Sequence, residues 1–299
     1  MRRIGLFVHL GKPQALEAVE RAIQMLQSLD VPCCIDPEAA RRLSGTVREY
    51  VKVLPFEEFE RFADVVMSFG GDGTMLKACH IFLKSALPVM GINIGKLGFL
   101  AEFSVEQLDA AISAVLTGDY IIEHRSVLEC RINDQVAYAL NDFVVHKQDF
   151  SRMITVKAYI DGKLISSYRA DALIVSTPTG STAYSLASGG PIIAPSCDVF
   201  CITPVAPHSL TVRPLVVPDS VEIAVEPFSE SGHVQLLADG MVVQPLGNNQ
   251  RVPLYKSRYA FKLLRQKTRT YYDLLKEKLL WATDAVQSPH SGITAKERS

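Results

Sequence analysis

Residues 65–74 of the chain read VVMSFGGDGT, and a helical pattern follows over 75–83. The apolar run at 65–69 predicts a buried strand, so this stretch is a strand that ends in a glycine loop and leads into a helix. Strands and helices alternate in the same way on either side, at residues 4–8, 13–26, 87–92 and 105–116. This order predicts a parallel sheet that helices cover on both faces.

After about residue 120 the spacing of apolar residues changes from helical to alternating. Apolar and polar side chains alternate over 128–132, 154–160 and 221–225. Asn133-Asp134 and Asp161-Gly162 are dipeptides that favour tight turns between antiparallel strands. This half of the chain is therefore predicted to be mainly antiparallel β.

The whole pattern predicts a two-domain α+β protein. We expect an α/β domain with a parallel sheet over residues 1–120 and a mainly antiparallel, all-β domain over 121–265. Residues 266–286 carry an apolar stripe at helical spacing, so we expect a C-terminal helix that packs back on the chain or onto a partner subunit. Residues 287–299 are polar, and we expect a disordered tail there.

The composition argues against several classes of protein. The chain has 299 residues, 48% hydrophobic and 21% charged, which is long and apolar enough for buried cores. Its 31 basic and 32 acidic residues give a formal net charge of -1, so nothing indicates nucleic-acid binding. No apolar run reaches the ~20 residues that a membrane helix needs.

The six cysteines and the histidines show no spacing typical of a zinc site. We therefore expect no metal held by a set of protein ligands, reduced thiols, and histidines with structural or surface roles. The first residues run directly into a predicted strand without the pattern of a signal peptide. These features favour a cytoplasmic protein.

The glycine loop indicates a phosphate site. Glycines let the backbone approach a ligand closely, and the start of the next helix offers free N–H groups and a positive dipole end. Lys77, one turn into this helix, can face the same anion. The loop lacks the Gly-Lys-Ser/Thr of a Walker motif and the third glycine of a dinucleotide fingerprint. The candidate phosphate-binding residues are Gly70, Gly71, Gly73 and Thr74.

Asp72 lies among these glycines, where a carboxylate repels phosphate. It can accept the proton of an attacking hydroxyl, or it can hold a metal ion. The alternative is a tight turn in which Asp72 only caps the helix. The loop by itself leaves these roles open.

The string GGDGT after an apolar strand resembles a signature shared by NAD kinases, lipid kinases of the diacylglycerol type and, in varied form, phosphofructokinases. The resemblance implies phosphoryl transfer onto a hydroxyl, with Asp72 as the general base. It leaves the acceptor of the phosphoryl group open.

Residues 176–191, STPTGSTAYSLASGGP, narrow the choice of acceptor. This hydroxyl-rich, glycine-punctuated stretch follows an apolar strand and suits an adenosine or ribose; the alternative is a long polar surface loop. The stretch closely resembles the glycine-rich substrate motif of the NAD kinase family. By that resemblance, NAD is bound by Asp72, Gly73 and Lys77 and by Thr182, Ala183, Tyr184, Ser185, Leu186 and Ala187.

Further residues match family positions across the chain. Asn141-Asp142, a β-turn when taken alone, resembles the family's Asn-Glu or Asn-Asp pair. Arg169 and Asp171 match a basic residue and an aspartate on the nicotinamide side, and Ala206 matches a small residue of the adenine pocket. Arg152 matches a residue that reaches the phosphates from a neighbouring subunit.

Two departures from the family pattern stand out. Met241 follows Asp239-Gly240 where many members carry a polar residue, so we expect no ligand role for Met241. Asp142 stands in place of a glutamate and has a shorter reach.

The resemblance implies an NAD kinase. It would transfer a phosphoryl group from ATP to the 2′-hydroxyl of the adenosine ribose of NAD, with a divalent cation, Mg²⁺, and as a homodimer or homotetramer. Two alternatives stay open: another kinase of the superfamily that acts on a lipid or a sugar, and a non-catalytic NAD or NADP sensor that has no need of Asp72.

Overall fold

The computed structural model describes residues 2–85, 87–148, 152–230 and 232–280. The N-terminal half forms one large sheet with the strand order β3-β2-β1-β4-β5-β20-β7, and β6 pairs with β5. Its strands are β1 (Ile4–Val8), β2 (Cys33–Ile35), β3 (Lys52–Val53), β4 (Val65–Gly70), β5 (Val89–Asn93), β6 (Phe103–Ser104), β7 (Ile121–Arg125) and β20 (Phe261–Arg265).

Helices cover both faces of this sheet, as predicted. The longer helices α1 (Pro13–Ser28) and α6 (Leu108–Thr117) share one apolar core with the sheet, and α4 (Phe59–Phe62) and α5 (Asp72–Phe82) share a second core on the other face. Helix α1 begins with Pro13, whose fixed φ suits a first turn, and it buries Val19, Ile23 and Leu26 against the sheet. Short turns of helix complete this half: α2 (Pro37–Ala40), α3 (Gly45–Arg48), η1 (Phe56–Glu58) and η2 (Val105–Gln107).

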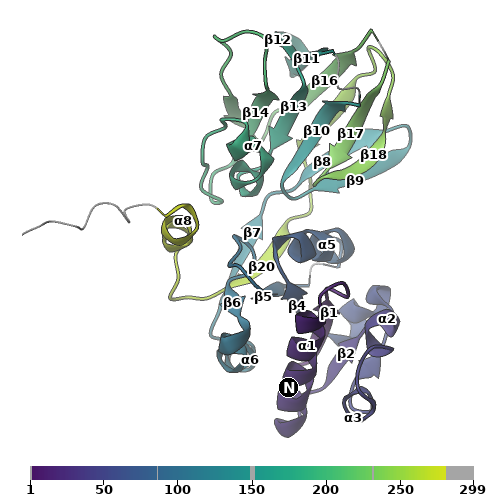
Figure 1. Cartoon of the computed structure of the whole chain (residues 1–299), viewed down its shortest axis with the longest axis vertical. Helices are drawn as coiled ribbons and strands as arrows, with labels where there is room; N and C mark the ends of the chain where they lie inside the picture. Colours follow the sequence, from purple (N-terminus) through teal and green to yellow (C-terminus); the bar gives the residue numbers. More distant parts are fainter. Residues whose placement is uncertain (1, 86, 149–151, 231, 281–299) are drawn as a thin grey trace, which may run out of the picture.

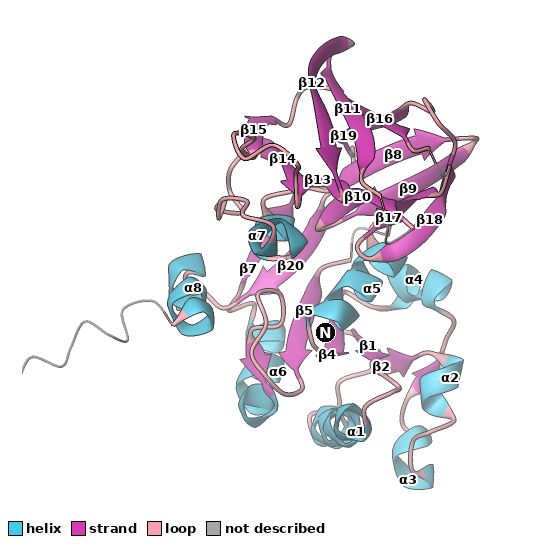
Figure 2. Ribbon diagram, turned by 45° about the horizontal axis from the view of Figure 1, so that its top comes forward, coloured by secondary structure: helices cyan, strands magenta, loops and turns pink. Residues whose placement is uncertain are grey.

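The C-terminal half is antiparallel β, as predicted, and its strands form a sandwich of two sheets (Figure 2). The first, here called the site sheet, contains β15 (Leu215–Pro218), β14 (Val199–Val205), β13 (Ala172–Ser176), β10 (Asp142–Lys147), β17 (Val234–Ala238) and β18 (Met241–Leu246). The second contains β12 (Lys163–Ala170), β11 (Ile154–Ile160), β16 (Ile223–Phe228), β19 (Val252–Lys256), β8 (Leu128–Ile132) and β9 (Gln135–Ala139). Both residues of each predicted turn dipeptide have positive φ values.

Strands β7 and β20 join the two halves. β20 pairs with β5 in parallel and with β7 in antiparallel orientation, so both strands extend the N-terminal sheet. The expected division at residues 120 and 265 assigns these strands to the second domain, whereas their hydrogen bonds lie in the first sheet. A strand pattern does not reveal the sheet that the strand joins, because pairing partners are distant in sequence.

Helix α5 begins at Asp72, earlier than the predicted start at residue 75. Gly71 occupies the N-cap, and the Thr74 hydroxyl accepts the Gly71 N–H at 3.4 Å. Gly73 has low helix propensity, which hid the first turn from the sequence pattern. Figure 1 shows α5 between the N-terminal sheet and the lower edge of the C-terminal sandwich.

Residues 176–191 are not a polar surface loop. They contain η3 (Thr179–Thr182) and α7 (Tyr184–Ala187), and Ser176, Thr177, Ser181 and Ser185 are buried. The alternative of a long surface loop is therefore wrong, because the hydroxyls bond inside the stretch: Ser181 donates to the Pro178 carbonyl at 2.7 Å.

The predicted C-terminal helix is α8 (Tyr271–Leu279), which buries Leu274 and Leu275. Its Lys278 donates a hydrogen bond to the carbonyl of Leu97. Residues 281–286 and the expected tail at 287–299 lie outside the described residues. No helix in the described ranges is long and apolar enough to cross a membrane.

Candidate active site

The Asp72 carboxylate is held by the backbone of a distant segment. Oδ2 accepts the N–H of Phe99 at 2.7 Å, and Oδ1 accepts the N–H groups of Leu100 at 3.0 Å and Ala101 at 3.3 Å. Gly98 makes this approach possible, since a Cβ at that position would lie 1.9 Å from Asp72 Oδ1. The side chain that the sequence singles out is thus oriented by three amides and is only partly exposed.

Helix α8 supports the segment that holds Asp72. Lys278 bonds to Leu97, and its ammonium lies 5.5 Å from the centre of the Phe99 ring, a cation–π distance. Arg269 donates to the Glu102 carbonyl at 3.3 Å. The C-terminal helix and Arg269, which precedes it, therefore contact the segment 97–102 that holds Asp72.

Thr74, the last residue of the phosphate loop, borders a small cavity of about 250 Å³. Thr74 and Lys77 of α5 line it, together with the backbone turn after β1 at Leu10 and Gly11. The carboxyl ends of β1 and β4 meet here, and α1 and α5, which follow these strands, lie on opposite faces of the sheet. Such a switch point in a parallel sheet is where nucleotides commonly bind.

The two other motifs meet in the C-terminal domain. β10 and β13 are antiparallel neighbours, and Asp142 pairs with Ser176, so Asn141-Asp142 lies beside the start of residues 176–191. The Thr177 hydroxyl donates to the Leu140 carbonyl at 2.5 Å. Gly180 lies against this turn so closely that a Cβ there would be 2.1 Å from the Asn141 carbonyl oxygen.

A cavity of about 410 Å³ lies over the outer face of the site sheet. Strand β10 alternates: Phe143 and Val145 enter the sandwich core, while Asp142, Val144 and His146 line the cavity. The remaining lining residues come from the turn before β10, the start of α7, strand β17 and the turn after β17. They are Asn141, Ala183, Tyr184, Leu237, Asp239 and Gly240. Apolar side chains on its floor and carboxylates at one end suit a nucleoside, whose base is flat and whose ribose is polar.

Burial and the nearby charge of Asp239 raise the pKa of Asp142 to about 7. Asp142 is 4% exposed, so its neutral form is favoured by the loss of hydration of the charge. Burial, followed by the charges of Asp171 and Asp142, also raises the pKa of Tyr184. The tyrosine therefore lies within the field of both carboxylates.

Asp171 and Ala206 lie at the opposite end of the site sheet, and Arg169 lies two residues before Asp171, in β12 of the second sheet. Asp171 donates its N–H to the Val205 carbonyl at 3.0 Å, which places it next to Ala206. The sequence predicts that Ala206 lies on the adenine side and that Arg169 and Asp171 lie on the nicotinamide side, and in the structure Asp171 and Ala206 are backbone neighbours. Lys147 pairs with Asp171 at 2.5 Å. Five residue steps along β10, about 17 Å, separate this end from Asp142.

The structure does not bring every candidate to the cavity. Ser185 is buried and bonds to the Thr203 hydroxyl at 2.9 Å, so it shapes α7 from inside. Thr182 donates to the Thr179 carbonyl at 3.3 Å. Leu186 and Ala187 continue α7 beyond the lining residues. Arg152 is 73% exposed and pairs with Glu230, so within one chain it lies apart from the cavity.

Asp239 and His80 connect helix α5 with the turn at residues 140–142. The sequence predicts no role in the site for either residue. Both oxygens of the buried Asp239 carboxylate accept N–H groups of the turn: Leu140 at 2.9 Å, Asn141 at 2.7 Å and Asp142 at 3.2 Å. His80 of α5 places Nε2 3.0 Å from Asp239 Oδ2.

The sequence held weak signals for these residues. Asp239-Gly240 is a turn dipeptide after an alternating run, and Asp239 has the positive φ of 49° that such turns require. His80 follows Asp72 by eight positions on one helix. Neither signal indicates that the two side chains meet.

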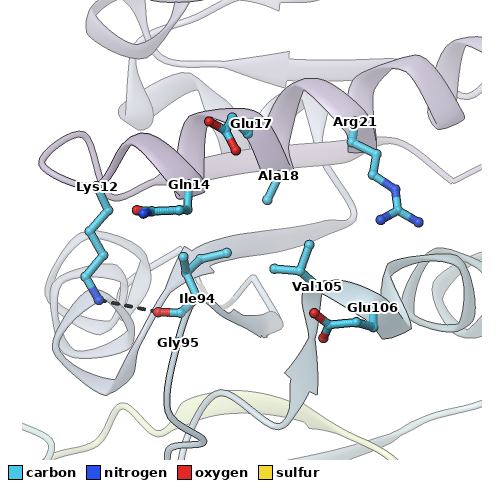
Figure 3. Close-up of a pocket in the computed structure, with 9 residues that line it drawn as sticks. All are labelled: Lys12, Gln14, Glu17, Ala18, Arg21, Ile94, Gly95, Val105 and Glu106. Atoms are coloured by element: carbon cyan, nitrogen blue, oxygen red, sulfur yellow. Dashed lines mark hydrogen bonds between the residues drawn. The ribbon is translucent and has the colours of Figure 1, made fainter.

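A third cavity, about 670 Å³, lies apart from these motifs (Figure 3). It is an open groove between α1 and residues 94–106, and Lys12 donates across it to the Ile94 carbonyl at 3.5 Å. Arg21 and Glu106 give it side chains of opposite charge. No predicted phosphate-loop or NAD-binding residue lines it.

The chain is similar to known proteins over most of its length. The ATP-NAD kinase N-terminal domain matches residues 4–120, and the ATP-NAD kinase C-terminal domain matches residues 140–266. An NAD kinase of Chlorobium phaeobacteroides is 38% identical over 286 residues, 94% of this chain and 98% of the relative. An NAD kinase of Heliobacterium modesticaldum is 38% identical over 288 residues, 93% of this chain and 99% of the relative.

Two solved structures share the fold. A yeast NADH kinase, solved in complex with NADH, has a TM-score of 0.85 at 26% identity and covers 95% of this chain and 89% of its own. An NAD kinase from Archaeoglobus fulgidus, solved in complex with ATP, has a TM-score of 0.71 at 26% identity and covers 94% of this chain and 99% of its own.

Proposed function

The chain belongs to the ATP-NAD kinase family, and from this premise we propose how its residues act. It is an NAD kinase: ATP donates the phosphoryl group, and the 2′-hydroxyl of the adenosine ribose of NAD accepts it. One observation carries the assignment of roles: Asn141-Asp142 and residues 176–191 pack against each other and line one cavity. Asp239, which lines that cavity, also contacts His80 of the helix that begins with Asp72.

Asp72 is the general base in this proposal. As the 2′-oxygen attacks the γ-phosphorus, its proton passes to the Asp72 carboxylate, the bond to the β–γ bridging oxygen breaks, and ADP leaves. The three amides of residues 99–101 support this role, because they orient the carboxylate before substrate arrives. Orientation before binding lowers the entropy cost of reaching the transition state.

NAD lies along the outer face of the site sheet. Asn141 and Asp142 hold one nucleoside through its polar edge, and Tyr184 packs against it from α7. The other nucleoside extends toward Asp171 and Ala206, about 17 Å along β10. The dinucleotide is long enough in extended form to span the two polar ends, and the apolar floor between them supports this placement.

ATP approaches from the cavity beside Lys77, where the α5 N-terminus and Lys77 neutralise its phosphates. The chain suits a magnesium ion that arrives with the nucleotide: Mg²⁺ often takes one or two carboxylates plus phosphate oxygens, and the described residues form no cluster of three ligands. Asp72 is the residue that would contact it, and the ion would neutralise developing phosphate charge.

We also propose a homodimer or homotetramer in the cytoplasm. Exposed apolar side chains on the edge strand β18, Met241 and Val242, support self-association, since an edge strand has unpaired N–H and C=O groups that can meet another chain. Arg152 then reaches the phosphates of a neighbouring subunit. The free cysteines, five of the six buried, support a reducing compartment.

The test is an assay of ADP release with ATP and Mg²⁺ as donor and with NAD, NADH, a diacylglycerol or fructose 6-phosphate as acceptor. We expect release only with the dinucleotides, and the product should carry a 2′-phosphate by NMR. Turnover with a lipid or sugar and none with NAD would overturn the assignment, and NAD binding without any turnover would indicate a sensor.

A further inference from the structure

Resting on the proposed function, we propose that His80 and Asp239 are positioning residues that couple helix α5 to the NAD-binding turn at residues 140–142. Asp72 begins α5, and His80 lies eight residues, about 12 Å, further along the same helix. The pair therefore sets where the general base stands relative to the ligand that Asn141 and Asp142 hold.

Asp239 acts as the centre of this link. Its side chain has 0% exposure, and its two oxygens accept three successive N–H groups of residues 140–142. The Asp239 N–H in turn donates to the Asp142 carbonyl at 3.0 Å. The turn thus keeps its shape through one buried carboxylate, in the way that a backbone concavity holds an anion.

His80 supplies the contact from the other domain. Its side chain is 23% exposed, and the buried Nε2 lies 3.0 Å from Asp239 Oδ2, a close polar contact that is not aligned as a hydrogen bond. A buried carboxylate needs more than one partner to offset its lost hydration. Without the imidazole, Asp239 has one polar partner fewer. The repulsion between its carboxylate and that of the neighbouring Asp142 is then less well offset.

Leu140 makes the link stiff. Its side chain is fully buried in the same core as Ala78 and Cys79 of α5. Its N–H donates to Asp239, and its carbonyl accepts the Thr177 hydroxyl. A shift of α5 therefore moves the turn at residues 140–142 and, through it, residues 176–191. These segments are distant from Asp72 in sequence, so this packing is what couples them.

The experiment compares His80→Ala, His80→Gln and a matched control on the same helix, Ile81→Ala, whose side chain is exposed. We expect His80→Ala to raise the KM for NAD by about tenfold, the size of one lost polar contact to a buried carboxylate, with the KM for ATP within about twofold. Gln can place an amide where Nε2 stood, so it should recover most of the NAD affinity. Ile81→Ala should match wild type.

A double-mutant cycle with Asp239→Asn sharpens the test. If the two residues form one link, His80→Ala adds little in the Asp239→Asn background. Equal losses for NAD and ATP, an unchanged KM for NAD, or full additivity would each overturn the proposal. The same cycle can be measured from NAD dissociation constants by calorimetry, which needs no turnover. A failure of the proposed kinase activity would appear separately, as absent turnover of the wild-type protein.

Discussion

The backbone N–H of Phe99 donates a 2.7 Å hydrogen bond to Oδ2 of Asp72, although 27 positions separate the two residues. The bond fixes one carboxylate oxygen on the side of residues 98–101. It also makes Asp72 dependent on a segment that Lys278 and Arg269 hold from the C-terminal end of the chain. The position of the predicted base therefore depends on three parts of the chain that are distant in sequence: the glycine loop, residues 98–101 and the C-terminal segment.

Asp72→Asn should lower kcat by about 10²- to 10⁴-fold, the range that loss of a general base produces. The amide keeps one oxygen to accept an N–H from residues 99–101, so the NAD dissociation constant should stay within about threefold. Steady-state kinetics and calorimetry measure the two quantities. Turnover like that of wild type would refute the assignment of the base.

Gly98→Ala should damage catalysis although it replaces no titratable group. Its Cβ would lie 1.9 Å from Asp72 Oδ1, so the carboxylate or the loop must move. A displacement of about 1 Å can cost about a hundredfold in rate. Gly45→Ala is the matched control, since nothing lies within 4 Å of its Cβ position. Equal kcat values for both variants would contradict the role of the loop.

The stability of the protein should depend on the ionisation of Asp142. Its pKa is about 7 in the folded chain and about 4 when unfolded, so the folded state retains the extra proton between these values. The resulting stabilisation is complete below about pH 4 and is lost as the pH rises through about 7. Asp142→Asn removes this dependence.

Urea unfolding at about pH 5 and about pH 8 tests that expectation. The free energy of unfolding should fall more for wild type than for Asp142→Asn across this interval, because the other titrating groups are common to both proteins. Parallel curves for the two proteins would show that Asp142 ionises normally.

Arg265→Met should destabilise the fold by about 3–5 kcal/mol, the cost of leaving buried charges unpaired. Arg265 of β20 is 4% exposed, and it bonds to Glu102, directly after the loop that holds Asp72, and to Glu123 at 2.8 Å. Arg21→Met, which breaks an exposed pair with Asp109, should leave the unfolding midpoint nearly unchanged. Equal midpoint shifts would contradict the difference in burial.

Much of the fold could be predicted from local patterns. The apolar run before the glycine loop is β4, the alternating runs are antiparallel strands, and the turn dipeptides have the positive φ values expected of them. Local sequence determines these features because side-chain periodicity and backbone conformation act within a few residues. The predicted start of α5 is wrong for the same reason. The glycines favour a loop by local propensity, although Gly73 lies in the first turn of the helix.

The motifs also determined, by resemblance, the family and its chemistry. What only the tertiary structure decided is how the motifs meet. β7 and β20 join the first sheet, Ala206 lies beside Asp171, and Asp239 holds the Asn141-Asp142 turn against His80. Each of these is a contact between residues far apart in sequence, formed when buried strands choose partners and buried carboxylates need donors. No local period encodes that choice, because it depends on the packing of the whole chain.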